Sequence, residues 1–114
     1  MIFIRYSRNQ GSGLHRLRME GHAGYAAAGE DIVCAACSAL GYAYSQTLRV
    51  LEGAGYCRIK RLRAGDGQLD VVAETDKGPE GEMAVCVAML TVEQGFRALQ
   101  EQYPENVQFD VISL

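Results

Sequence analysis

The feature that most constrains the fold of this 114-residue sequence is a long amphipathic stripe in its first half. Apolar residues recur there at intervals of three and four, which predicts a helix with one buried face. The stripe comprises Val33, Cys37, Leu40, Tyr44, Leu48 and Leu51. Asp31 is a natural N-cap for this helix. Two glycines, Gly53 and Gly55, end it, so we expect a helix from residue 32 to about residue 52.

A second stripe in the last third of the chain predicts another amphipathic helix. It comprises Val85, Ala88, Met89, Val92, Phe96, Leu99 and Tyr103. Pro104 closes this helix, and a loop is expected before it over residues 76–81. Gly95 inside the helix costs about 1 kcal/mol relative to alanine. A glycine at that position therefore favours a close packing contact.

Five further segments alternate apolar and polar residues and are predicted to be strands. They cover residues 2–6, 14–20, 56–63, 69–75 and 107–114, with turns at 9–13 and 64–68. The element order is therefore β-β-α-β-β-α-β in one α+β domain over residues 1–114. Two helices on one face of a mostly antiparallel sheet would bury both stripes most simply. The alternative is a three-layer arrangement with one helix on each face.

Composition assigns the chain to the folded globular class, with 48% hydrophobic and 22% charged residues. The first ten residues, MIFIRYSRNQ, lack the apolar core of a signal peptide. No apolar run approaches the roughly 18 residues that a membrane span needs. We therefore expect a cytoplasmic protein with no membrane contact, whose four cysteines are reduced.

Residues 21–38, GHAGYAAAGEDIVCAACS, carry the strongest chemical signal. Cys34 falls in the first turn of the predicted helix, and His22 precedes it by a short loop. An imidazole can accept a thiol proton, and a helix N-terminus stabilises the resulting thiolate. Cys34 and His22 are therefore candidate nucleophile and base. Asp31 either orients His22 or only caps the helix.

The loop at residues 23–30 is predicted to cover this site. It contains four alanines and two glycines, and Tyr25 is its one large side chain. Glycines at its start and end supply hinges for a movable cover. We place these hinges near Gly21, Gly24 and Gly29.

The other cysteines and histidine leave alternatives open. Cys34 and Cys37 form a CxxC at a helix start, where a dithiol redox pair would lie. Against this, Cys37 belongs to the apolar stripe. Cys57 and Cys86 are expected in the core, and His15 is expected to be an ordinary strand residue. With a single CxxC, no closed four-ligand zinc set is completed.

Charge is unevenly distributed along the chain. Residues 1–63 hold nine Lys/Arg and four Asp/Glu, whereas residues 64–114 hold two and ten. This asymmetry indicates either faces for oppositely charged partners or solvent faces of different charge. The basic run at residues 58–63 lacks interleaved aromatics and favours a solvated strand face over a phosphate contact.

The motif of residues 21–38 resembles that of the ribosomal-processing cysteine protease family, Prp. The matching residues are Gly21, His22, Ala23, Gly24, Tyr25, Gly29, Asp31, Ile32, Val33, Cys34, Ala35, Ala36 and Ser38. The order of strands and helices fits that family as well. Cys37 occupies a place where the family usually has a small apolar residue.

The resemblance implies a homodimeric peptidase that removes the N-terminal extension of large-subunit ribosomal protein twenty-seven. It assigns catalysis to His22 and Cys34 and the covering loop to residues 23–30. No cofactor, metal, membrane or direct nucleic-acid partner is expected. We expect backbone N–H groups at the helix start, including that of Cys34, to form the oxyanion hole. A dithiol redox protein and a non-enzymatic ribosome-binding module are the alternatives from other classes.

Overall fold

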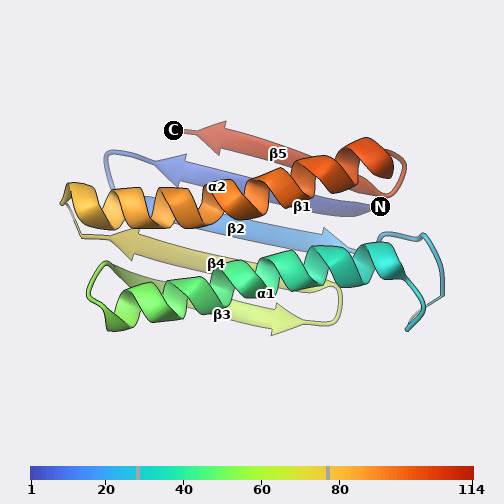
Figure 1. Cartoon of the computed structure of the whole chain (residues 1–114), viewed down its shortest axis with the longest axis horizontal. Coiled ribbons are helices and arrows are strands. Elements are labelled where there is room, and N and C mark those ends of the chain that lie inside the picture. Colours follow the sequence, from blue (N-terminus) through green and yellow to red (C-terminus); the bar gives the residue numbers. More distant parts are fainter. Residues whose placement is uncertain (28, 77) are drawn as a thin grey trace.

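The structure is a computed structural model that describes residues 1–27, 29–76 and 78–114. Within these residues the chain forms five strands and two helices in the predicted order (Figure 1). Their bounds are β1 Ile2–Asn9, β2 Leu14–Gly21, α1 Ile32–Gly53, β3 Cys57–Gly65, β4 Gln68–Thr75, α2 Pro79–Gln102 and β5 Val107–Ser113. Ala28, in the expected loop 23–30, and Lys77, in the expected loop 76–81, lie outside the described residues.

The strands form one mostly antiparallel sheet in the order β3-β4-β2-β1-β5. Neighbouring strands pair antiparallel except β1 and β5, which pair parallel. Both helices lie on the same face of the sheet (Figure 1). The α+β prediction with a two-layer arrangement is therefore confirmed, and the three-layer alternative is wrong. Neither helix has an apolar stretch long enough to cross a membrane, within the residues that the structure describes.

Helix α1 buries the face that the apolar stripe predicted. Its buried residues are Val33, Cys37, Gly41, Tyr44, Ser45 and Leu48. Gly41 faces the sheet, where an added Cβ would lie 2.7 Å from Leu69 Cδ2 and 2.8 Å from Met19 Sδ. A glycine at this position therefore lets the helix approach β2 and β4 closely.

Helix α2 begins at Pro79, within the loop that the sequence predicted over residues 76–81. Proline suits the first helical position, where its missing N–H has no partner to lose and its φ is already helical. Glu80 and Glu82 in the same turn complement the positive end of the helix dipole. The expected contact at Gly95 is confirmed, since a Cβ there would lie 2.7 Å from Leu40 Cδ1.

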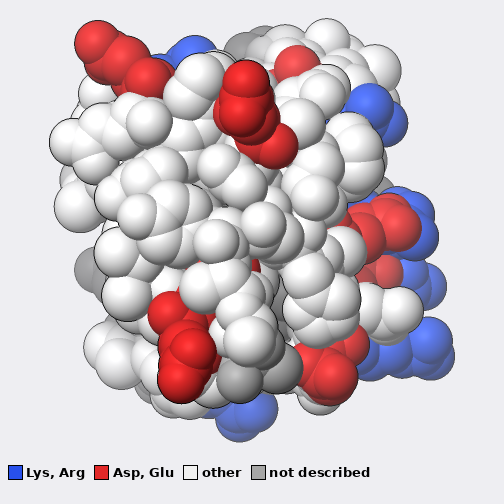
Figure 2. All heavy atoms as spheres, turned by 90° about the vertical axis from the view of Figure 1, so that its right-hand side faces the viewer, with Lys and Arg blue, Asp and Glu red and all other residues white. Residues whose placement is uncertain are grey.

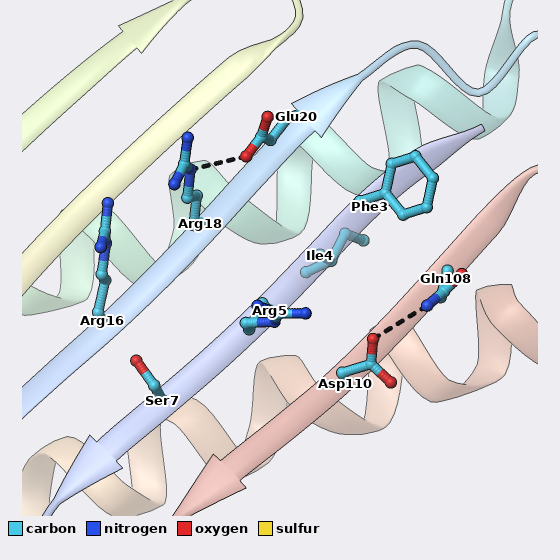
Figure 3. A pocket seen from close by; sticks show the side chains of 9 residues that line it. All are labelled: Phe3, Ile4, Arg5, Ser7, Arg16, Arg18, Glu20, Gln108 and Asp110. Carbon is cyan, nitrogen blue, oxygen red and sulfur yellow. Dashed lines mark hydrogen bonds and ion pairs between the residues drawn. The ribbon is translucent and has the colours of Figure 1, made fainter.

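The other face of the sheet is left uncovered by the two helices and is rich in arginine. Figure 3 shows three of these side chains, Arg5, Arg16 and Arg18, around a depression of about 330 Å³. On β3, Arg58 pairs with Glu74 and Arg61 pairs with Asp70, at 3.0 and 3.2 Å. The basic run is therefore an exposed strand face on which two of its four cations are ion-paired.

The two ends of the sheet differ in chemistry. One end is formed by the end of β2, the start of α1 and the β3–β4 turn, and we call it the Cys34 end. The opposite end is formed by the β1–β2 turn, the end of β4 and the start of α2. We call it the His15 end. The right-hand side of Figure 1 is the Cys34 end.

Candidate active site

A cavity of about 110 Å³ opens at the Cys34 end. His22, Cys34 and the β3–β4 turn line it, and Ser38 and Tyr42 of α1 extend one wall. Apolar side chains form another part of its lining: Ile2, Met19 and Leu69. The structure thus brings together on one cavity the two residues that the sequence singled out.

Cys34 is a free, half-buried thiol at the third position of α1. Its Sγ accepts a hydrogen bond from the N–H of Ala23 at 3.1 Å. A backbone N–H directed at the sulfur and a position in the first turn of a helix are both common features of nucleophilic cysteines. This environment suits a nucleophile.

His22 follows the last residue of β2. The chain leaves the strand through Gly21, whose φ of +93° favours glycine. The imidazole packs against the β3–β4 turn. A Cβ added to Gly67 in this turn would lie only 2.9 Å from His22 Nε2. The side chain is exposed and makes no hydrogen bond within the described residues. Its ring nitrogens are therefore accessible for proton transfer.

Asp31 is the N-cap of α1, as predicted. Its Oδ1 accepts the N–H groups of Val33 and Cys34 at 3.0 and 2.9 Å. Its Oδ2 accepts two N–H groups of the preceding loop at 3.0 and 3.3 Å. These hydrogen bonds, that of Cys34 first, hold the pKa of the Asp31 carboxyl below its usual value. Asp31 thus joins helix and loop, and in this structure it does not orient His22.

The cap contradicts one expectation about the oxyanion hole. The N–H of Cys34 is donated to Asp31 Oδ1, and the N–H of Ala35 is donated to Asp31 O at 3.1 Å. The prediction that the Cys34 N–H is available for an oxyanion is therefore wrong for this conformation. The N–H of Ala23 is a donor that already lies at the sulfur.

None of the described residues of the expected covering loop, 23–27 and 29–30, lines the cavity, although its first residue, Ala23, bonds to Cys34. The ring of Tyr25 meets that of Tyr103 edge-on, with centroids 5.3 Å apart. Gly24 and Gly29 have φ values of +70° and +87°, in the region that favours glycine. The loop therefore has two glycines with positive φ and an aromatic contact just after the end of α2, while its hinges and its movement stay predictions.

The remaining cysteines differ in burial. Cys37 is completely buried, and burial, with smaller effects of Cys34 and Asp31, raises the pKa of its thiol to about 12. Such a thiol contributes to the core as a small apolar group. Cys57 is buried as expected. Cys86, inside α2, is only half-buried, so the expectation that it lies in the core is wrong.

His15 is not the ordinary strand residue that we expected. It is buried at the His15 end, where its Nδ1 bonds to the Tyr6 hydroxyl and its Nε2 to Glu82 at 3.0 Å. Glu82 also accepts hydrogen bonds from Arg8 at 2.9 Å and Thr75 at 2.8 Å. The alternation along β2 could not reveal this network, because its partners come from β1, β4 and α2.

The same network contains the one cluster of potential metal ligands among the described residues. Atoms of His15, Glu82 and Cys86 lie within 4.8 Å of one another. The Arg8 guanidinium already bonds to this carboxylate, so the charge of Glu82 is balanced without a metal ion. Neither His22 nor Cys34 belongs to the cluster.

Sequence reasoning missed two residues that support the site. Gly67 forms the surface on which the His22 ring rests. Asn106, in the α2–β5 connection, donates its side-chain N–H to the carbonyl of Ala23 at 2.9 Å. The turn at residues 64–68 was recognised as a turn, but no local signal placed it beside His22. Nothing in the sequence pattern connected Asn106 to Ala23.

A reduced cysteine at a helix start, hydrogen-bonded at its sulfur and sharing a cavity with an exposed histidine, is the arrangement of an enzyme with a thiol nucleophile. Comparison with known proteins identifies the family within this class. The sequence profile of the family "Cysteine protease Prp" matches residues 1–108. The chain belongs to this family and is a cysteine protease.

Solved structures share the fold. Two are of an essential ribosomal processing protease Prp from S. aureus, one with a covalently linked product peptide and one with a substrate peptide. Each is 22% identical and covers 97% of this chain and 99% of its own, with TM-scores of 0.72 and 0.68. SMU.848 from Streptococcus mutans is 26% identical, with a TM-score of 0.66, over 100% of this chain and 96% of its own. A comparison with curated proteins found no match.

Proposed function

We propose that this protease removes the N-terminal extension of large-subunit ribosomal protein twenty-seven, with Cys34 as nucleophile and His22 as general base and acid. The observation that carries the catalytic assignment is the shared cavity of these two residues at the start of α1. The substrate assignment rests on the resemblance of residues 21–38 to the Prp motif. It is supported by the similar fold of the S. aureus ribosomal processing protease.

The reaction is an acyl transfer through a covalent intermediate. His22 takes the proton of Cys34, and the sulfur electron pair forms a bond to the scissile carbonyl carbon while the carbonyl π electrons move to oxygen. The tetrahedral intermediate collapses and expels the amine, which receives its proton from His22. Water, deprotonated by His22, then hydrolyses the thioester and restores the thiol.

In this proposal the N–H of Ala23, and not that of Cys34, donates to the oxyanion of the tetrahedral intermediate. It donates to Sγ at 3.1 Å, so it is within reach of the oxygen of a carbonyl that bonds to the sulfur from the side of Ala23. Donors fixed at a developing oxyanion are usually among the larger contributions to catalysis. Binding of an extended peptide would order the loop 23–30 over the cavity through its glycine hinges and exclude water.

Charge at the Cys34 end favours a basic substrate. Figure 2 looks onto this end and shows carboxylates over a largely uncharged surface, with most Lys and Arg along one edge. The exposed acids include Glu30, Asp66 and Glu105. A basic ribosomal protein would be attracted here, mainly through a higher association rate.

We propose further that the enzyme acts in the cytoplasm and that it is a homodimer. Sedimentation of the purified protein would test the dimeric state.

The decisive experiment is cleavage of a peptide that spans the N-terminal extension, using wild type, Cys34→Ala and Cys37→Ala. We expect cutting by wild type and Cys37→Ala at comparable rates and none by Cys34→Ala. No cutting by any of the three proteins, with a dithiol that titrates and exchanges, would instead indicate redox chemistry. Binding of the peptide without cutting by any form would indicate a non-enzymatic module.

A further inference from the structure

Asn106 lies far from the motif in sequence but next to it in space. It precedes β5, and its main chain is fixed on two sides. Its carbonyl accepts the N–H of Ile2 at 2.9 Å, and its N–H is donated to the carbonyl of Tyr103 at 2.9 Å. The residue is thus anchored to the start of β1 and the end of α2, and its side chain projects from a rigid base.

The side chain of Asn106 ends at Ala23. Its Nδ2 donates to the Ala23 carbonyl at 2.9 Å, in a part-buried position. Ala23 is 1% exposed, so its peptide groups need partners within the protein. Its N–H is donated to Cys34 Sγ, and its carbonyl is taken by Asn106. A single residue therefore connects the Asn106 amide to the candidate nucleophile.

No backbone requirement explains an asparagine at this position. Asparagine is often selected for a left-handed backbone, but no described non-glycine residue has a positive φ. The hydrogen bond to Ala23 is the one side-chain hydrogen bond that Asn106 makes within the described residues. The amide is thus present at the right place to act as a donor.

The contact matters because Ala23 lies beyond the last residue of β2. Gly21 is held by its N–H, which is donated to the carbonyl of Gly67 at 2.9 Å, whereas His22 is exposed without a hydrogen-bonded partner among the described residues. Hydrogen bonds to an ionised acceptor are strong but weaken steeply with distance and angle. A hydrogen bond that holds Ala23 therefore also holds the donor at the sulfur.

We propose that Asn106 is a positioning residue, which holds Ala23 so that its N–H stabilises the thiolate of Cys34. Asn106 contacts neither the sulfur nor His22 and acts through one peptide unit. The role rests on the proposed function in one respect, since it assumes that Cys34 is the nucleophile. It links the α2–β5 connection, a segment outside the motif, to the reactivity of the site.

The test uses Asn106→Ala and the near-isosteric Asn106→Asp, which keeps the shape of the side chain but replaces the donor by an acceptor. The matched control is Asn9→Ala, because Asn9 also makes a side-chain hydrogen bond to backbone, at 3.1 Å to the N–H of Ser12, but at the His15 end. Alkylation of Cys34 by iodoacetamide is followed by mass spectrometry across pH. Folding of every variant is followed by circular dichroism.

We expect both Asn106 variants to be folded and to alkylate Cys34 about 10-fold more slowly than wild type near neutral pH. The pH of half-maximal alkylation should move upward, and Asn9→Ala should behave as wild type. For peptide cleavage, kcat should fall by a similar factor while KM changes less than about twofold.

Wild-type alkylation rates in folded Asn106→Ala and Asn106→Asp would overturn the proposal. Loss of the folded state in both variants would also overturn it, because Asn106 would then be a structural residue. Failure of the proposed function has a different signature. In that case the peptide is not cut even by wild type, while the alkylation difference between wild type and the Asn106 variants can still be measured.

Discussion

The two ends of the sheet each bring together a histidine, a cysteine and a carboxylate, but they use them in opposite ways. At the His15 end, His15 is completely enclosed and both its ring nitrogens have side-chain partners. At the Cys34 end, His22 is exposed, and Cys34 is held by a backbone N–H. The carboxylate there, Asp31, bonds to backbone N–H groups alone among the described residues.

This difference indicates what separates a structural polar cluster from a candidate active site. A network whose members satisfy one another stabilises the fold and has no capacity left for a substrate. Groups that lack side-chain partners, yet are fixed by the backbone around them, can exchange protons and form bonds with a ligand. The residue types at the two ends therefore do not distinguish the candidate active site. The hydrogen-bond partners of these residues distinguish it.

The largest effects, on activity and on stability, should come from replacing each of the two histidines by alanine in separate variants. His22→Ala should lower kcat/KM by about 10²–10⁴-fold, the usual range for loss of a general acid–base, with Tm unchanged within about 2 °C. His15→Ala should instead cost about 3 kcal/mol of unfolding free energy, since it leaves the Tyr6 hydroxyl without its hydrogen-bond partner and removes one of the hydrogen bonds of Glu82.

Peptide cleavage and urea unfolding of both variants make this measurement. Folded His15→Ala should keep most of its activity. If His22→Ala kept more than about a tenth of wild-type kcat/KM, the assignment of His22 as acid–base would be wrong.

The second-largest effect should be a loss of stability at low pH, and it depends on Glu82. Burial alone would raise the pKa of Glu82, but hydrogen bonds from His15, Thr75 and Arg8 outweigh it and lower this pKa to about 2. A carboxyl with a lowered folded-state pKa adds stability above its unfolded pKa, and this stability is lost as pH falls from about 4.5 to 2. Glu82→Gln should remove on the order of 2 kcal/mol at neutral pH.

Urea unfolding of wild type and Glu82→Gln at several pH values tests this point. The two proteins should converge in stability as pH falls toward 2. Glu101→Gln, which removes an exposed carboxylate of the same helix, is the control. A difference between wild type and Glu82→Gln that is constant with pH would show that Glu82 contributes by packing rather than by charge.

The third effect tests the surface on which His22 rests. Gly67→Ala places a Cβ 2.9 Å from His22 Nε2, so the ring must move, and we expect kcat/KM to fall about 10-fold. Gly55→Ala is the matched control. Gly55 also has a positive φ, of +85°, but its added Cβ meets no atom within 4 Å beyond its own residue and its two chain neighbours.

Both glycine variants should lose about 1 kcal/mol of stability from the same backbone strain. Urea unfolding measures this loss, and peptide cleavage separates the two variants. Equal activities would mean that the position of His22 against the turn does not matter to catalysis.

The order of elements and the candidate pair could be predicted because both depend on local sequence. Periodicity of three to four marked the helices, and alternation marked the strands. His22, Asp31 and Cys34 belong to one contiguous segment, in which the capping residue set the position of the cysteine in the helix. The structure places all three where that segment suggested.

What could not be predicted depends on contacts between distant segments. The burial of His15 requires Glu82 from α2, and the support of Ala23 requires Asn106 from the α2–β5 connection. The N–H of Cys34 was expected to be free, because its acceptor, the Asp31 side chain, could equally have turned toward His22. Periodicity and spacing carry no information on such tertiary choices.

The smallest effect concerns the charge of the two ends. The double variant Glu30→Gln/Glu105→Gln removes two exposed carboxylates beside the loop at the Cys34 end. Asp76→Asn/Glu80→Gln removes two at the His15 end and is its charge-matched control. For a basic peptide at low salt, we expect kcat/KM to fall about twofold in the first variant and to stay at the wild-type value in the second. The difference should vanish near 0.5 M salt, where charges a few ångströms apart are screened. Equal losses in both variants would mean that net charge attracts the substrate, and the asymmetry between the ends would then have no part in recognition.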